Sequence, residues 1–157
     1  MLKVRQISSD FADIVHNIQK KSFEPLLNKY HDYDINPAME SVEQIREKID
    51  RANTTAYIFE LNDIYVGWVR VTELEDITYK ISALCVLPGY QNRGIAQEAL
   101  KQIESYHSNA QKWTLDTIFQ EKGNCHLYEK LGYVKVGELE QINERMVIVK
   151  YMKICKA

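Results

Sequence analysis

The sequence predicts a mixed α/β sheet with helices on its faces, folded as a single domain over residues 1–157. Segments rich in β-branched and aromatic residues alternate with segments in which apolar residues recur at helical spacing. The chain is long enough to bury a core without disulfides or a metal. No repeat, low-complexity tract or Pro/Gly-rich linker divides it, so the sequence indicates one domain.

The N-terminal part of the chain predicts a strand followed by a helix. Apolar and polar residues alternate over residues 2–7, which is typical of a half-buried strand. Residues 8–23 predict a helix with Ser9 or Asp10 as its N-cap. The apolar face of this helix consists of Phe11, Ile14, Val15 and Ile18.

A second helix follows after an irregular stretch. Residues 24–40 are aromatic and acidic, and we expect irregular structure there. Ser41 and Gln44 have the spacing of a capping box, in which each side chain accepts a hydrogen bond from the other residue's main-chain N–H. The capping box predicts a helix over residues 41–50.

Three strands are predicted next. Residues 54–61 and 64–72 form a hairpin with residues 62–63 at its turn. Residues 78–87 form the third strand, and its apolar end indicates a central strand that is covered on both faces. Pro88 ends this strand.

The remainder of the chain predicts two helices and three strands. A helix over residues 94–107 carries one apolar stripe, and a short helix over residues 124–132 ends at Gly132 as its C-terminal cap. The stripe consists of Ile95, Ala96, Ala99, Leu100, Ile103 and Tyr106. Strands are expected over residues 112–118, 133–140 and 145–154, the last two as a hairpin.

The composition argues against several classes of protein. The net charge of −2 lacks the basic excess that is typical of nucleic-acid-binding proteins. No apolar run reaches the ~18 residues of a membrane span, and the N-terminus lacks the apolar core of a signal peptide. The three cysteines are widely spaced and the four histidines are scattered. We therefore expect reduced thiols, no metal site and a cytoplasmic location.

The turn between Pro88 and Gly94 has the features of an anion site. Main-chain N–H groups at a helix N-terminus are unpaired and lie at the positive end of the helix dipole, where phosphate groups bind. Gly94 permits close approach, and Arg93 adds a positive charge. The alternative is a plain strand-to-helix turn. The glycine patterns of P-loops and of dinucleotide-binding folds are absent.

Residues 84–96, "LCVLPGYQNRGIA", resemble the acetyl-CoA signature of the GNAT N-acetyltransferase superfamily, in which L-x-V-x-P is followed by a tyrosine and Q/R-x-x-G-x-G/A. A second family pattern, "LYEKLGY", occupies residues 127–133, and the predicted order of elements also matches. The resemblance implies a mostly antiparallel sheet with helices on both faces. It also implies a parallel pair, residues 81–87 and 112–118, that splays apart around the thioester of acetyl-CoA.

The resemblance further assigns residues to CoA. Main-chain groups of Leu84, Cys85 and Val86 would pair with the pantetheine arm, as an added strand does at a sheet edge. The N–H groups that would bind the pyrophosphate belong to Gln91, Asn92, Arg93, Gly94, Ile95 and Ala96. Asn124 either contacts CoA or caps the short helix.

Tyr128 occupies the position of the tyrosine that often protonates the departing CoA thiolate, a role that suits a phenol. Packing alone is the alternative. The strand glutamate that many relatives use as a base is absent, since Lys80 and Ser82 stand at the nearby positions. Asp116 and Glu121 are the remaining candidates for the base, and a water chain is the alternative.

The acceptor is expected near the first two helices, where Tyr30, Asp32 and Glu40 favour a cationic amine. A solvated acidic loop is the alternative. A polyamine, an aminoglycoside, an amino acid and a protein N-terminus all remain open, as do a monomer and a homodimer. The predicted function is direct transfer of an acetyl group from acetyl-CoA to a primary amine of a small molecule or peptide. A non-catalytic acyl-CoA sensor is the alternative.

Overall fold

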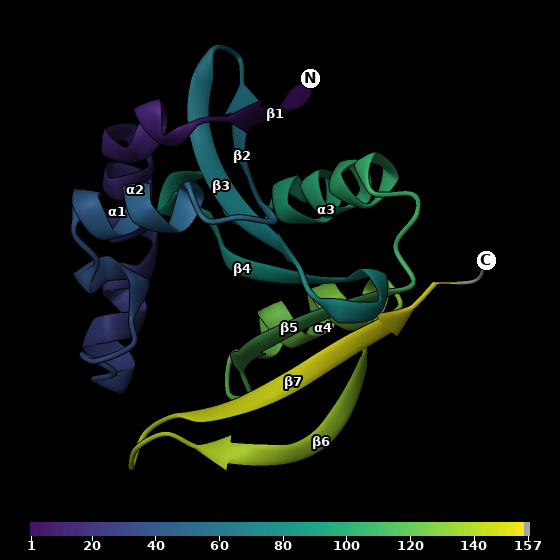
Figure 1. The fold of residues 1–157 in the computed structure, drawn as a ribbon. Helices are drawn as coiled ribbons and strands as arrows, with labels where there is room; N and C mark the ends of the chain where they lie inside the picture. The colour runs from purple at the N-terminus through teal and green to yellow at the C-terminus, as the bar shows by residue number, and fades with distance from the viewer. Residues whose placement is uncertain (156–157) are drawn as a thin grey trace.

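The computed structural model describes residues 1–155, which form one seven-stranded sheet in the order β1-β2-β3-β4-β5-β7-β6 (Figure 1). The strands are β1 (Leu2–Ile7), β2 (Thr54–Leu61), β3 (Ile64–Glu73), β4 (Thr78–Val86), β5 (Lys112–Ile118), β6 (Val134–Gln141) and β7 (Val147–Ile154). The helices are α1 (Ala12–Tyr30), α2 (Val42–Ile49), α3 (Ile95–Tyr106) and α4 (Lys122–Lys130). Neighbouring strands are antiparallel except β4 and β5, so the predicted mixed sheet is confirmed.

Helices cover both faces of the sheet, as Figure 1 shows. On one face, α1 and α2 enclose a core with residues of β2 and β3, among them Ile58 and Trp68. On the other face, α3 and α4 pack on a larger core that includes Trp113 and Tyr151. The predicted stripe of α3 is buried at Ile95, Ala99, Leu100 and Ile103. The prediction for Tyr106 was wrong, because this side chain is half exposed.

Helix α1 is longer than predicted at its C-terminal end. The prediction ended it at residue 23, but the helix continues through Pro25 to Tyr30 and ends at His31 in a left-handed conformation, with φ of 54°. Leu27 and Tyr30 are buried, and this burial offsets the main-chain hydrogen bond that Pro25 cannot donate. Tyr30, which the sequence placed in an irregular stretch, is therefore the last residue of a helix.

The start of this segment also differs from the prediction. Ser8, rather than Ser9 or Asp10, is the N-cap, and its hydroxyl accepts a hydrogen bond from the Asp10 N–H at 3.3 Å. A turn of 3-10 helix over Ser9–Phe11 precedes α1. Ile14 is 39% exposed and does not belong to the buried face, whereas Val15 and Ile18 do. The capping box of Ser41 and Gln44 is present as predicted.

The parallel pair of strands splays apart. β4 and β5 are paired only from Thr78 to Lys80, opposite Lys112–Thr114. Further along β4, a bulge places two residues, Ala83 and Leu84, opposite the single residue Val69 of β3, with Ala83 at a φ of +58°. Among residues 1–155, the edge of β4 that faces β5 therefore has no strand partner beyond Lys80.

The close approach of β3 and β4 depends on Gly67. A Cβ atom at this position would lie 2.4 Å from the Cys85 carbonyl oxygen and 2.8 Å from Cδ2 of Phe59. We expect Gly67→Ala to lower the free energy of unfolding by ~1–3 kcal/mol, because buried backbone must move to admit the methyl group. Urea denaturation measures this change. Gly89→Ala is the matched control, since no atom of the described chain lies within 4 Å of its added Cβ. Equal midpoints for the two variants would contradict the prediction.

Candidate active site

A cavity of about 1140 Å³ opens between the splayed strands. It runs from the turn after β4, past α4, to the C-terminal part of α1 and the α1–α2 loop. We call the part lined by Pro25, Leu26, Lys29, Asp32 and Ile35 the acceptor end. The volume exceeds that of a typical drug-sized pocket, so it accommodates a long flexible ligand together with a second small molecule.

The amide turn, residues 91–97, forms the other end of the cavity. Within the described chain, no acceptor receives the main-chain N–H groups of these residues. The Gln91 side chain fixes the turn by donating to the Val86 carbonyl at 2.9 Å. Gly94 is the N-cap of α3 with a φ of 78°, and a Cβ added there would meet no atom of the described residues within 4 Å. Unpaired N–H groups at a helix N-terminus beside open space fit a pyrophosphate.

The predicted CoA-binding residues line the cavity, with one exception. Leu84, Cys85, Val86, Gln91, Asn92, Gly94, Ile95, Ala96 and Asn124 all line it. Arg93 does not, and its guanidinium lies over the Tyr90 ring, 5.3 Å from the centroid. Asn124 lies inside α4 rather than at its N-cap, because the helix begins at Lys122 instead of the predicted residue 124.

Tyr128 lies on α4, is buried, and faces the cavity. The end of α4 fixes it, since the Tyr133 N–H donates to the Tyr128 carbonyl at 3.0 Å and the two rings meet edge to face at 6.0 Å. Gly132 permits this cap with its φ of 97°, as predicted. Burial raises the pKa of Tyr128, and nearby Cys125 raises it further, so the phenol keeps its proton. It is therefore suited to donate a proton into the cavity.

Asp116 and Lys80 face each other across the gap between the splayed strands. The Lys80 Nζ lies 3.7 Å from Oδ2 of Asp116, and both residues line the cavity. Asp116 lies within β5, two residues before the strand ends at Ile118. A carboxylate beside this gap is positioned to accept a proton from an amine that enters it.

Glu121 is held by two donors from α1. Lys29 Nζ donates to its Oε2 at 2.8 Å, and the Tyr30 hydroxyl donates to the same oxygen. Burial alone would raise the pKa of Glu121, but the hydrogen bonds from Lys29 and Tyr30 and the Lys29 charge outweigh it, and the pKa is lowered. The low proton affinity makes Glu121 a poorer base than a carboxylate without such donors. It connects the end of α1 to the start of α4.

The three residues predicted to bind the acceptor have different surroundings. Asp32 is buried and lines the cavity, and its carboxylate accepts from Asn36 Nδ2 at 3.1 Å. Tyr30 and Glu40 do not line the cavity. The Tyr30 hydroxyl is directed to Glu121, and the Glu40 carboxylate is bound by Lys48 and Gln19.

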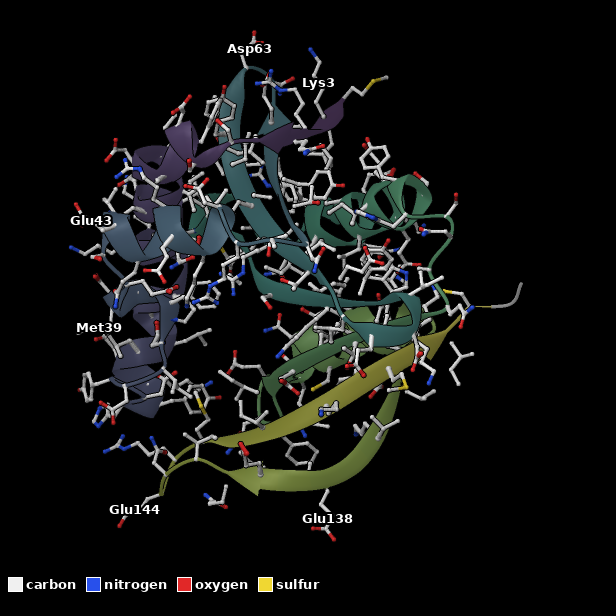
Figure 2. The ribbon with its side chains drawn as sticks, viewed as in Figure 1. Lys3, Met39, Glu43, Asp63, Glu138 and Glu144 are labelled. Carbon is white, nitrogen blue, oxygen red and sulfur yellow. The ribbon has the colours of Figure 1, made fainter. Side chains whose placement is uncertain are left out.

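The β6–β7 loop completes the acceptor end, a feature the sequence did not indicate. Asn143 donates from Nδ2 to the Tyr30 carbonyl at 3.0 Å, and its Oδ1 accepts from the Met146 N–H at 2.9 Å. Met146 lines the cavity. Figure 2 shows the neighbouring Glu144 at the tip of this hairpin. An asparagine in a turn is an ordinary capping residue, so its pattern gave no hint of a contact with α1.

The described residues 1–155 also bear on a metal site, on the thiol of the cavity and on a membrane span. No group of three or more His, Cys, Asp or Glu side chains is placed to hold a metal ion there. Cys85 is buried, and burial raises the pKa of its thiol to about 12, so it remains a packed thiol. In the described part of the chain, no helix is both long and apolar enough to span a membrane.

A parallel pair of strands that opens around an amide-lined turn and a buried tyrosine is the arrangement of a CoA-dependent acyltransferase. The family model described as the acetyltransferase (GNAT) family matches residues 13–133, and the chain belongs to this family. It therefore transfers an acetyl group from acetyl-CoA to an amine. The comparisons give no support to a non-catalytic sensor.

Solved structures share the fold at low sequence identity. The spermidine N-acetyltransferase from Vibrio cholerae, in complex with CoA and spermine, matches with a TM-score of 0.77 and 19% identity, over 98% of this chain and 95% of that one. The ribosomal-protein-S18-alanine N-acetyltransferase from Escherichia coli matches with a TM-score of 0.78 and 12% identity, over 100% of this chain and 96% of that one. A putative streptothricin acetyltransferase from Bacillus anthracis str. Ames, in complex with acetyl coenzyme A, matches with a TM-score of 0.73 and 18% identity, over 99% of each chain. No curated protein sequence matches the chain.

Proposed function

We propose that the acceptor is a small cationic amine and that Asp32 binds one of its ammonium groups. The observation that carries this proposal is a buried carboxylate that lines the cavity without a cationic partner among residues 1–155. A buried charge is costly unless a counter-charge accompanies it, so the site favours a cation. Apolar side chains at the acceptor end, including Leu26 and Ile35, suit the methylene segments of such a molecule.

Acetyl-CoA supplies the acetyl group as a thioester, and the residues described above divide the remaining work. The N–H groups of the amide turn hold the pyrophosphate, and unpaired main-chain groups of β4 bind the pantetheine arm and polarise the thioester carbonyl. Asp116 takes the proton that the amine loses. Tyr128 donates a proton to the leaving sulfur.

Polyamines are the first acceptors to test, because a molecule with several amino groups can engage Asp32 and the reacting centre at once. The shared fold with a spermidine N-acetyltransferase supports this choice. Release of free CoA thiol, measured with spermidine, an aminoglycoside, an amino acid and a peptide, tests the proposal. Turnover of the peptide alone would contradict it.

Asp32→Asn is expected to raise the KM for the cationic amine by ~10-fold or more, because an isosteric amide removes the charge that pairs with the ammonium. The KM for acetyl-CoA should stay unchanged. Steady-state kinetics with each substrate varied in turn measures both constants. Asp34→Asn is the matched control, since Asp34 lies in the same loop but is exposed and outside the cavity. Equal amine KM values in the two variants would remove Asp32 from the acceptor site.

A further inference from the structure

We propose that the enzyme acetylates itself at Lys80 when no acceptor amine is present. This inference rests on the acetyl transfer described above, and it adds a second, internal acceptor at the same centre. Lys80 is a primary amine on a splayed strand, at the position where pairing between β4 and β5 ends. Its side chain lines the cavity and is 42% exposed.

The face of the sheet places the Lys80 amine on the acceptor side. Tyr79 and Ile81 belong to the core under α3 and α4, so Lys80 between them points to the opposite face, toward α1. On β5, Trp113 and Leu115 also point into this core, so Asp116, the residue after Leu115, points to the same face as Lys80. This is the side from which an acceptor amine would approach.

The direction of the side chain brings the amine into the gap. The strand partner of Lys80 is Thr114, whereas its ammonium lies near Asp116, two residues further along β5 toward the open end of the pair. The Lys80 side chain therefore leans from the last paired position into the space that the splayed strands enclose. The 3.7 Å separation from Oδ2 is an ion pair too long for a hydrogen bond, so the amine is not locked to its partner.

The other lysines of the cavity are less suitable acceptors. Lys29 donates to Glu121 at 2.8 Å, and this hydrogen bond raises the pKa of Lys29, which keeps its amine protonated and unreactive. Lys130 is the last residue of α4 and does not lie on a splayed strand. Lys80 alone among these three projects from the strand that forms the wall of the gap.

The reaction uses the same groups as acetylation of an external amine. The Lys80 ammonium gives a proton to Asp116, and the neutral Nζ attacks the thioester carbonyl carbon. An N–C bond forms, the C–S bond breaks, and Tyr128 donates a proton to the leaving sulfur. The nitrogen passes its second proton to solvent, and solvent returns one to Tyr128. The products are acetyl-Lys80 and CoA, with no change of oxidation state.

The test is incubation of the whole protein with acetyl-CoA and no amine, followed by intact-mass measurement and peptide mapping. We expect one acetyl group per chain, located on Lys80. Lys80→Arg should abolish the modification. Lys150→Arg is the matched control, because Lys150 is the register partner of Asp116 on β7 but lies outside the cavity. It should leave the modification unchanged.

Two further measurements separate this inference from chemical acetylation and from the proposed function. Tyr128→Phe should slow acetylation of Lys80 by the factor by which it slows amine turnover, whereas chemical acetylation would not change. Modification spread over surface lysines, or unaffected by Lys80→Arg, would overturn the proposal. Turnover of amines without modification of Lys80 would also overturn it and leave the proposed function intact. Modification of Lys80 without turnover of any cationic amine would support it and refute the proposed acceptor.

Discussion

Replacing Tyr128 with Phe is expected to lower kcat by ~10²–10⁴, the usual contribution of one general acid. The variant removes a hydroxyl and little volume, so the packing of Tyr128 against Tyr133 should persist. Because burial raises the pKa of the phenol, it remains protonated and available as a donor at neutral pH. The loss should appear in kcat with both KM values unchanged, since the proton is transferred only in the transition state.

Tyr133→Phe is the matched control for this experiment. It removes a buried hydroxyl from the neighbouring ring, but that hydroxyl donates to Glu104 Oε2 at 3.1 Å and does not line the cavity. We expect a loss of stability and a kcat within a few-fold of wild type. A Tyr128→Phe variant within about threefold of wild type, with chemistry shown to be rate-limiting, would end the assignment of Tyr128 as the acid.

Gly94→Glu is expected to abolish binding of acetyl-CoA. The added side chain would occupy the open space beside Gly94, and its carboxylate would repel the phosphate groups. For the wild type, acetyl-CoA at ~100 times its Kd should stabilise the fold by ~2.7 kcal/mol, which is a rise in Tm of about 5–10 °C. In the variant this rise should disappear.

Two controls separate the ligand effect from backbone strain. Gly94 has a φ of 78°, so any side chain there is strained, and Gly94→Asn tests strain with an uncharged residue that tolerates this conformation. Gly89→Glu adds the same charge at a nearby glycine without a left-handed φ, outside the cavity. If acetyl-CoA raised the Tm of Gly94→Glu as much as that of the wild type, the pyrophosphate would bind elsewhere.

Local signals predicted most of the fold, and they failed where packing between distant segments overrode them. The capping box at Ser41 and the cap at Gly132 are short-range chemistry and were predicted correctly. The continuation of α1 through Pro25 was missed, because the local preference of proline opposes it and only burial of Leu27 and Tyr30 favours it.

The sequence predicted those parts of the candidate site that a single short segment forms. The amide turn and Tyr128 each belong to a local motif, and the structure brings both to one cavity. The acceptor end depends on contacts across the chain, such as the hydrogen bonds from Lys29 and Tyr30 to Glu121. Asp32 and Glu40 are both acids of one segment, and no pattern distinguishes the one that lines the cavity from the one bound by Lys48.

The short pairing of β4 with β5 has a further consequence for the motions of the molecule. Within residues 1–155, strand pairing joins β1–β4 to β5–β7–β6 through three residue pairs, so few main-chain hydrogen bonds hold the edge of β4 at this joint. If the pantetheine arm binds along β4 as proposed, it would take the place of the missing strand and hydrogen-bond amides that otherwise exchange with water. We therefore expect the enzyme to stiffen when its donor binds and to loosen when CoA leaves. Amide exchange along the free edge of β4 would then follow the catalytic cycle.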